Sequence, residues 1–526
     1  MSLPRFFSRV TDALTPLIAG AADVPEFLEH KAVRLEAPGD IDVHQFHAAG
    51  FLLLANLCAR LYPEIRIVAP ERVSDEARRI ALSINPACDV VLGPGKGTAG
   101  ATLAWACPKP DARAIAIAPV GWEILVDLPD SEKVVPTNML TALAAAAIGA
   151  GELFRVVFAD FLSSGRSEAS PGRFNVLTHA PVKPELPEMP SNIALGRVHL
   201  VGAGAVGQAL VYTLARVSAS GTLVVVDPEQ VTLSNLQRYV LTTDADVGKS
   251  KCQLVEQAFA KTKQIVPVSV EAPWSLDDFD LQEPEVICAA VDTERLRVEL
   301  QGALPRRIYN AWTQPADLGW SRHERFGIDP CLACLYWPTT KRPSLHENVA
   351  RAIRQDALRV LGYLINSVPV DQPLRAEQIP RVSDLPVPPE ASIWTERPLL
   401  DDIGAEFELD QAQVAVWQGK LLGDLYRDGI CGGALVHSRQ VEIPVEMAVP
   451  LAHQSVFAGI MLAVQLLAAS SPDLREHRGE AIEYRLDLLA GLPQIAARPR
   501  ARTPGCICDD EDYVLRYREK WKDGAS

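Results

Sequence analysis

The amino-acid sequence predicts an α/β protein with two related halves of alternating strands and helices, and a helical insertion in the second half. Three observations predict this fold. Short runs rich in β-branched residues, such as 64–68 and 222–227, alternate with helical patterns. A glycine-rich turn joins a strand at 197–201 to a helix at 202–217, as in a βαβ unit. From 344 to 429 the pattern changes to helical segments broken by proline, without strand alternation.

Length and composition narrow the classes of protein that fit. A chain of 526 residues is too long for one core and predicts roughly two to four folded units. A net charge of −15 argues against a general binder of nucleic acid or anionic membrane. The N-terminus, residues 1–22, lacks the apolar core of a secretion signal, and the longest apolar stretch, 456–469, is too short to span a bilayer. Ten sparse cysteines fit a reducing compartment, so we expect a soluble, cytoplasmic protein.

The first half has an α/β pattern of its own. The elements expected there are helices at 48–61, 74–84 and 137–158, with strands at 64–68 and 89–92. The run GPGKGTAG, Gly93 to Gly100, invites comparison with a phosphate-binding P-loop. It departs from that motif because Lys96 is followed by Gly97 rather than Ser or Thr, so we expect a flexible turn. Residues 168–194, rich in Pro, Glu and Ser, are expected to form a linker.

The second half continues the alternation beyond the glycine-rich turn. The elements expected there are a helix at 249–261, strands at 266–270 and 286–290, and, after the insertion, an extended segment at 442–449 and a helix at 454–468. The glycine-rich sequence GAGAVG contributes Gly202, Gly204 and Gly207, and Asp227 closes the next strand. Such glycines permit a tight turn, the helix N-terminus attracts phosphate, and the acid binds ribose hydroxyls. NAD, FAD and ATP sites all use variants of this motif.

Further along, four residues favour a triphosphate. Asn235, Arg238 and Lys251 follow the second strand, and Asp292 follows a later one. A hydride-transfer enzyme has no need of two cations and a second carboxylate around its nucleotide, whereas an enzyme that cleaves between the α- and β-phosphates does. Arg238 and Lys251 can neutralise the phosphates, and Asp292 can hold Mg²⁺. The alternative is that both cations are ordinary solvated surface residues.

Two close pairs of cysteines predict a metal site. Cys331 and Cys334 form C-x-x-C, and Cys506 and Cys508 form C-x-C. Four thiolates in two pairs suit a tetrahedral structural Zn²⁺. Free cysteines in loops or the core, or a redox role for the first pair, are the alternatives.

The run from Gly202 to Arg297 resembles the adenylation core of the ThiF/MoeB/HesA-like ubiquitin-activating enzyme family. The shared features are GAGAVG, Asp227, the segment SNLQR at 234–238, the segment GKSK at 248–251, and Asp292 followed by Arg297. Tyr239 stands where Gln is usual, and Ala205 where a third Gly often stands. The resemblance implies a Rossmann-like adenylation fold, ATP, Mg²⁺ and structural Zn²⁺. It further implies adenylation of the C-terminal carboxylate of a ubiquitin-like protein.

The same resemblance suggests a role for Cys431, which precedes Gly432 and Gly433. Some members have a cysteine before a glycine-rich segment and a long helix, and it accepts the acyl group as a thioester for transfer to a conjugating enzyme. A thiolate suits this attack at neutral pH, and His437 is a candidate neighbouring base. A buried core cysteine is the alternative. The compact layout resembles the activating component of bacterial ubiquitin-like conjugation operons, including anti-phage ones.

Members of the family work as dimers or as pseudo-dimers of an inactive and an active unit, so we expect one of these arrangements here. The expected parts are a degenerate adenylation-like domain at 1–167, a linker at 168–194, an active adenylation domain at 195–343 and 431–510 with a zinc-binding end, a helical insertion and catalytic-cysteine region at 344–430, and a tail at 511–526. Arg5 or Arg9 would complete the ATP site. If the first half were instead a conjugating domain, Cys107 would be the residue to test.

Two other functions compete with this prediction. The chain could adenylate a sulfur-carrier protein, although such activators are typically shorter and lack the inserted segment. It could also be a non-catalytic scaffold or an NAD-binding oxidoreductase, which Arg238, Lys251 and Asp292 disfavour.

Overall fold

The computed structural model describes most of the chain in two compact units, one formed by residues 1–337 and 449–526 and the other by 338–448. The described residues are 6, 10, 13–14, 24–29, 31–162, 171–179, 186–262, 264–275, 284–314, 317–337, 345–381, 387–425, 450–489, 491–492 and 496–522.

The first half of the larger unit contains a seven-stranded sheet in the order β3-β2-β1-β4-β5-β6-β7. The first five of these strands pair in parallel, and β6 and β7 pair antiparallel. The strands are β1 (Ala32–Glu36), β2 (Glu64–Val68), β3 (Asp89–Leu92), β4 (Ala101–Trp105), β5 (Ile115–Val120), β6 (Glu123–Val126) and β7 (Gly172–Asn175), and the helices are α2 (Val24–Glu29), α3 (Gln45–Ala59), α4 (Glu71–Ile84) and α5 (Met139–Val157).

The second half contains an eight-stranded sheet in the order β10-β9-β8-β11-β12-β13-β14-β15. Its strands are β8 (Ile193–Val201), β9 (Ala219–Val226), β10 (Ile265–Val270), β11 (Val286–Ala289), β12 (Arg307–Gln314), β13 (Asp317–His323), β14 (Glu483–Leu486) and β15 (Ala496–Arg498). Its helices are α6 (Ala205–Leu214), α7 (Lys251–Phe259), α8 (Glu294–Gly302), α9 (Leu332–Tyr336), α15 (Ala452–Ser470), α16 (Pro472–His477) and α17 (Glu511–Lys520).

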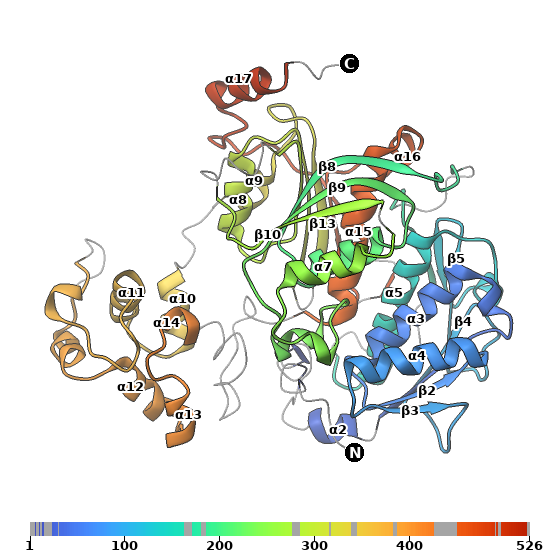
Figure 1. Cartoon of the computed structure of the whole chain (residues 1–526), viewed down its shortest axis with the longest axis horizontal. Coiled ribbons are helices and arrows are strands. Elements are labelled where there is room, and N and C mark those ends of the chain that lie inside the picture. The colour runs from blue at the N-terminus through green and yellow to red at the C-terminus, as the bar shows by residue number, and fades with distance from the viewer. Residues whose placement is uncertain are drawn as a thin grey trace. The chain divides into compact units, whose positions relative to one another are not determined.

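The two sheets repeat one topology. Strands β8 to β14 follow the order of β1 to β7, with the same change from parallel to antiparallel pairing. Helices α3, α4 and α5 occupy the same places between strands as α6, α7 and α15 (Figure 1). The connection that follows the second strand of each half differs in length. Only Ala69 and Pro70 separate β2 from α4, whereas the segment 227–250 separates β9 from α7.

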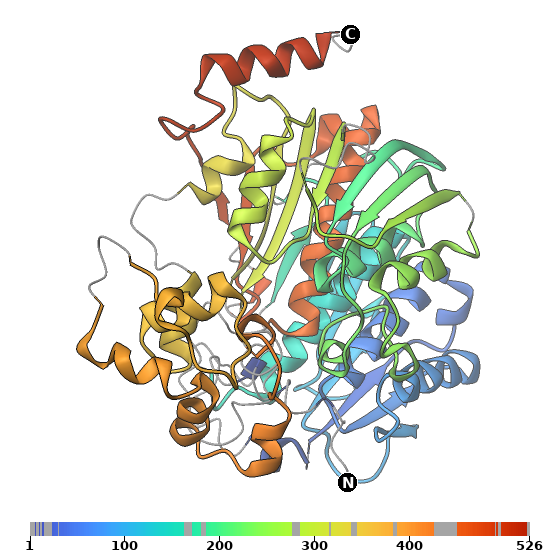
Figure 2. The ribbon, with the colours of Figure 1, turned by 60° about the vertical axis from the view of Figure 1, so that its left-hand side comes forward.

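Helices α5 and α15 form the centre of the larger unit. They contact each other, and α15 also packs along β8, β12 and β13, as its red-orange ribbon beside the green strands shows (Figure 2). Both are long and apolar enough to cross a membrane, but 94% and 100% of their apolar windows lie buried inside the protein, as in core helices. Close packing requires a glycine here, because a Cβ on Gly459 of α15 would lie 2.4 Å from the carbonyl oxygen of Val206 in α6.

The smaller unit is helical in its described part. Its helices are α10 (Leu345–Ala352), α11 (Ala357–Asn366), α12 (Leu399–Glu406), α13 (Gln411–Ala415) and α14 (Leu422–Asp424). They enclose a separate apolar core that includes Ile353, Tyr363 and Ile403. Its two ends lead back to the larger unit, and the helical character expected between 344 and 429 is present in these described residues.

The α/β class predicted from the sequence is confirmed, with two differences in detail. Residues 172–175 lie inside the stretch expected to be a linker, yet they form β7 and pair with β6. The second half begins at 193 rather than 195, because β8 starts there. The run Gly93 to Gly100 is a turn after β3, as expected, and three of its glycines have positive φ. The extended segment expected at 442–449 lies outside the described residues.

Candidate nucleotide and metal sites

The glycine-rich turn after β8 has the geometry that its motif predicts. Gly202 has a φ of +93°, and a Cβ there would lie 2.5 Å from the carbonyl oxygen of Ala290. A Cβ on Gly207 would lie 2.1 Å from the carbonyl oxygen of Gly202, so only glycine lets α6 begin this close to the strand. Gly204 is the N-cap of α6 and makes no side-chain capping bond. The first N–H groups of α6 are therefore not capped by its side chain and can bind a phosphate.

Asp227 and Lys251 form a buried pair beside this turn. The Asp227 carboxylate accepts hydrogen bonds from the backbone N–H of Ala203 at 2.7 Å and of Glu229 at 2.9 Å. Lys251 is only 3% exposed, and its Nζ lies 3.9 Å from Asp227 Oδ1 and donates to Glu229 Oε2. Asp227 thus fixes the turn, and Lys251 supplies a cation beside it.

Burial and charge shift the pKa of both groups. Burial raises the pKa of Asp227, although Lys251 and the two backbone N–H groups favour its ionised form. Burial alone would lower the pKa of Lys251, but the electrostatic influence of Tyr239 and of the Asp227 and Glu229 carboxylates outweighs it and raises that pKa above its ordinary value. Lys251 is therefore fully cationic at neutral pH.

Arg238 and Asn235 lie on the loop between β9 and α7, in and after the 3₁₀ helix η4 (Leu233–Gln237). Asn235 Oδ1 accepts the backbone N–H of Thr232 at 3.0 Å and so caps η4. Arg238 is half-buried, and its Nη1 is buried without a hydrogen-bond partner among the described residues. Such an unpartnered donor next to a glycine-rich turn suits an anionic ligand. The centroid of the Tyr239 ring lies 5.3 Å from Arg238 Cζ and 5.2 Å from Lys251 Nζ.

Asp292 lies at the same edge of the sheet as Gly202. β11 pairs with β8, and the N–H of Ala290 donates to the carbonyl of Val201, which places the residues after both strands side by side. Asp292 is exposed there. Arg297 has a structural role: its buried guanidinium donates to the carbonyl of Val291 and to Asn310 Oδ1, and so fixes the start of the Asp292 loop.

Four cysteines meet between α9 and the segment after β15. The Sγ atoms of Cys331, Cys334, Cys506 and Cys508 all lie within 4.8 Å of one another. Three of their separations are 3.9, 3.6 and 3.3 Å. Zn–S bonds of about 2.3 Å put tetrahedral sulfurs about 3.8 Å apart, so this donor set fits Zn²⁺. The N–H of Thr503 points to Cys334 Sγ at 3.4 Å, a contact that would orient a thiolate ligand.

The other predicted site residues either lie outside the described residues or are buried. Cys431, His437, Arg5 and Arg9 lie outside the described residues. Cys107 is buried, and burial together with the charge of Glu36 raises the pKa of its thiol to about 11, which makes it a poor nucleophile at neutral pH. Cys252 and Cys288 are fully buried and pack in the core.

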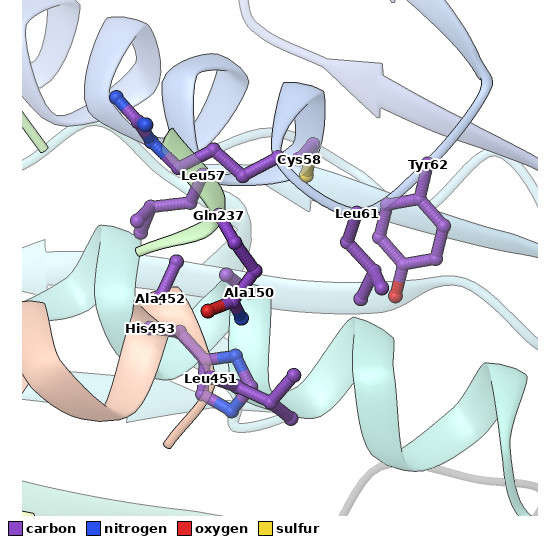
Figure 3. Close-up of a pocket in the computed structure, with 10 residues that line it drawn as sticks. Leu57, Cys58, Leu61, Tyr62, Ala150, Gln237, Leu451, Ala452 and His453 are labelled. Atoms are coloured by element: carbon purple, nitrogen blue, oxygen red, sulfur yellow. The ribbon is translucent and has the colours of Figure 1, made fainter. Parts of the chain in front are cut away.

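A small cavity lies where the two halves meet, beside the loop between β9 and α7. Figure 3 shows Gln237 directed toward Ala150 and His453, with Tyr62 on the far side. Its volume of about 10 Å³ suits a single water molecule rather than a nucleotide. Tyr62 Oη, Gln237 Oε1 and His453 Nε2 are buried here without partners among the described residues, and burial lowers the pKa of His453 to about 3. A bound water would satisfy these neutral groups.

Sequence reasoning missed two residues at the nucleotide site. Glu229 pairs with Lys251, and its position two residues after Asp227 in the run DPEQ was the available signal. Tyr239 departs from the family motif, yet its ring contacts both cations. Its hydroxyl oxygen would lie 3.5 Å from a Cβ added to Gly204, so it also borders the glycine-rich turn.

The fold and this site define a nucleotide-binding α/β protein with a Rossmann-like parallel sheet. The model of the ThiF family matches residues 188–356. The uncharacterized protein y4jF of Sinorhizobium fredii is 30% identical over 556 residues, which cover 99% of this chain and 98% of that protein. The chain belongs to the ThiF family of adenylating enzymes.

Two further similarities concern parts of the chain. The SAMP-activating enzyme E1 of Haloferax volcanii is 44% identical over 86 residues, which cover 16% of this chain and 30% of that enzyme. The crystal structure of E. coli MccB with MccA-N7isoASN aligns with a TM-score of 0.34 and 12% identity, over 60% of this chain and 67% of that one.

Proposed function

We propose that this chain is a ubiquitin-activating-type enzyme that uses ATP and Mg²⁺ to adenylate the C-terminal carboxylate of a small ubiquitin-like protein. The observation that carries the proposal is the buried cation Lys251, held against Asp227 beside the glycine-rich turn. Arg238, with its unpartnered Nη1, adds a second cation on the same loop. Two cations beside an uncapped helix N-terminus suit a triphosphate better than a dinucleotide. The similarity to an enzyme named as SAMP-activating supports a protein carrier as the substrate.

In the proposed reaction, a carboxylate oxygen of the carrier attacks the α-phosphorus of ATP. The bond from that phosphorus to the bridging oxygen breaks, and pyrophosphate leaves with the electron pair. Lys251 and Arg238 would neutralise the charge that develops on the phosphates, and the N–H groups of α6 would bind a phosphate oxygen. Mg²⁺ would supply a Lewis acid on the phosphates, with the exposed Asp292 as its candidate ligand.

The second proposed step uses Cys431. Its thiolate attacks the carbonyl carbon of the acyl-adenylate, AMP leaves, and the thioester then passes to the thiol of a conjugating-enzyme-like protein. Further parts of the proposal are a cytoplasmic location, a role in bacterial antiviral conjugation, homodimer formation, and a structural Zn²⁺ at the four cysteines. We also infer that the first half is an inactive partner of the second. The two sheets share one topology, but within 31–162 no loop corresponds to 227–250, and Ala37 follows β1 where Gly202 follows β8.

The test of the first step is ATP–pyrophosphate exchange with candidate ubiquitin-like carriers. Exchange should require an intact carrier C-terminus and should fall about 100-fold or more in Lys251→Ala. Lys249→Ala is the matched control, because Lys249 lies two residues away, is 39% exposed and pairs with Asp246. Undiminished exchange in Lys251→Ala would overturn the assignment.

The test of the second step is a carrier adduct that is cleaved by thiol. It should disappear in Cys431→Ala and persist in Cys107→Ala, whose thiol is buried. Adenylation without any adduct on Cys431 would point instead to activation of a sulfur-carrier protein.

A further inference from the structure

One arginine of the first half of the chain forms hydrogen bonds with the loop between β9 and α7 in the second half. Arg60 follows the last residue of α3 and is only 1% exposed. Its guanidinium donates to the backbone carbonyls of Leu236, of Val240 at 3.2 Å and of Thr242 at 3.0 Å. Its Nε donates to Asn56 Oδ1 at 3.0 Å.

The segment that these bonds hold is the loop with the predicted nucleotide contacts. Residues 232–242 include Asn235 and Arg238, together with the Tyr239 ring that contacts Arg238 and Lys251. Arg60 binds this loop on both sides of Arg238, at Leu236 before it and at Val240 and Thr242 after it. Asn56 adds a bond from its amide to the carbonyl of Val240 at 3.3 Å. Arg238 thus lies on a short segment of this loop, and the first half of the chain holds that segment on both sides of Arg238.

An arginine at this position indicates a specific role, because the buried site is unfavourable for a charged side chain. Burial lowers the pKa of Arg60 to about 9, and among the described residues its hydrogen bonds go only to neutral oxygens. A buried cation without a carboxylate is costly to maintain. An apolar residue would fill the volume without that cost, but it would leave the loop carbonyls unsatisfied. The planar guanidinium has five N–H donors in a fixed fork and serves the three loop carbonyls and Asn56 together, whereas a lysine ammonium has three donors.

The difference between the halves explains why the first half, within residues 31–162, has no counterpart of this arrangement. The connection from β2 to α4 is only Ala69 and Pro70, so the first half has no corresponding loop for a residue of the second half to hold. The residue at the matching place after α6 is Ala215, which has no polar side chain.

We propose that Arg60 is a positioning residue for the adenylation site: the first half sets the conformation of the loop that presents Arg238 and Tyr239 to the nucleotide. This inference rests on the proposed function insofar as the nucleotide is ATP. The positioning itself is a property of the free protein and can be measured without the reaction.

The experiment compares Arg60→Lys with Arg155→Lys in the full chain. Arg155 is a matched control because it is also 1% exposed, lies in the same half on α5, and pairs with Glu152 away from the loop. Amide hydrogen exchange of peptides covering 232–242 should speed up about 100-fold in Arg60→Lys and stay unchanged in the control. Asn56→Ala, which removes one bond to Val240 and the partner of Arg60 Nε, should give a smaller effect in the same direction.

Nucleotide binding and catalysis provide the second readout. In Arg60→Lys the KM for ATP should rise about tenfold, while the KM for the carrier stays within about twofold. The inference would be overturned if amide hydrogen exchange in 232–242 were unchanged in Arg60→Lys. It would also be overturned if Arg155→Lys raised the KM for ATP as much as Arg60→Lys does. If the loop loosens but the wild-type protein neither binds ATP nor exchanges pyrophosphate, the positioning role stands and the proposed function fails.

Discussion

Replacing Lys251 by methionine tests the buried pair at the nucleotide site in the free protein. Methionine keeps the length and most of the packing of the side chain but removes the charge. Asp227, which is 6% exposed, then loses the cation that lies 3.9 Å from its Oδ1. Leaving one buried charge without its partner typically costs about 3–5 kcal/mol.

Protonation of Asp227 sets an upper limit to this cost. A carboxyl with an ordinary pKa near 3.9 needs about 4 kcal/mol to bind a proton at pH 7 and about 2 kcal/mol at pH 5.5. Burial already raises the pKa of Asp227, so the loss of Lys251 raises it further. An acid with a raised folded pKa destabilises the fold at high pH and ceases to do so as the pH falls toward its unfolded pKa. The deficit of Lys251→Met should therefore shrink from at most about 4 kcal/mol at pH 7 to at most about 2 kcal/mol at pH 5.5.

Thermal unfolding of the nucleotide-free protein at both pH values measures this deficit. Each kcal/mol corresponds to a Tm shift of about 1 °C for a unit as large as residues 1–337 and 449–526, because the entropy of unfolding grows with size. Lys249→Met removes a cation whose side chain is 39% exposed, and it should shift Tm by less than about 1 °C at either pH. A Tm deficit of Lys251→Met that is the same at pH 7 and pH 5.5 would refute the reasoning, because it would mean that no buried carboxylate becomes protonated.

Three other predictions concern separate parts of the larger unit. Cys334→Ser should lower the bound zinc from about one ion per chain to less than half of that, and tryptic cleavage within 499–522 should become faster. The affinity for ATP should be retained. A wild-type protein that contains no zinc would contradict this prediction. In Glu324→Gln the bidentate bond from Arg478 is weakened. Although burial alone would raise the pKa of Glu324, Arg478 and Tyr309 lower it to about 2, so the pair stabilises the fold above pH 4.5 and this contribution is lost as the pH falls toward 2. The stability difference from wild type, about 2–3 kcal/mol at pH 7, should therefore vanish near pH 2 in urea titrations. Gly207→Ala should weaken ATP binding by about tenfold or more in calorimetry, since its Cβ would clash with the Gly202 carbonyl at 2.1 Å, whereas Gly39→Ala, with open space around it, should not.

Local pattern was enough to place two strands of the first half. The bounds of β2 and β3 agree with the expected 64–68 and 89–92, because runs of β-branched residues there are bounded by turn residues. β7 was missed, since its strand, GRFN, is short and lies in a stretch whose proline and serine content indicates a linker. Its pairing with β6 supplies the stabilisation that the local sequence does not indicate.

The motif residues were found for the same reason, because each follows a strand at the carboxyl edge of the sheet. Asp227 and Arg238 come from one loop and Lys251 begins the helix that follows it, so the sequence alone brings them near the glycine-rich turn. Arg60 could not be found in this way. The loop carbonyls that accept its hydrogen bonds lie 176 or more residues further along the chain, and nothing local distinguishes it from a surface arginine at a helix end.

The contrast between the halves indicates what makes one of them a nucleotide site. Both have the sheet, the three helices and the close helix packing, so the scaffold alone does not decide. The deciding feature is the segment 227–250, which supplies the acid of the turn, Arg238 and the N-cap of α7, and which the first half shortens to Ala69 and Pro70. Losing that loop removes Arg238 and the acid of the turn, and Ala37 and Pro38 follow β1 where Gly202 follows β8, so the backbone there lacks the glycine that permits close approach to a phosphate. The first half nevertheless contributes to the site, because α5 completes the core around α15 and Arg60 fixes the loop that only the second half has.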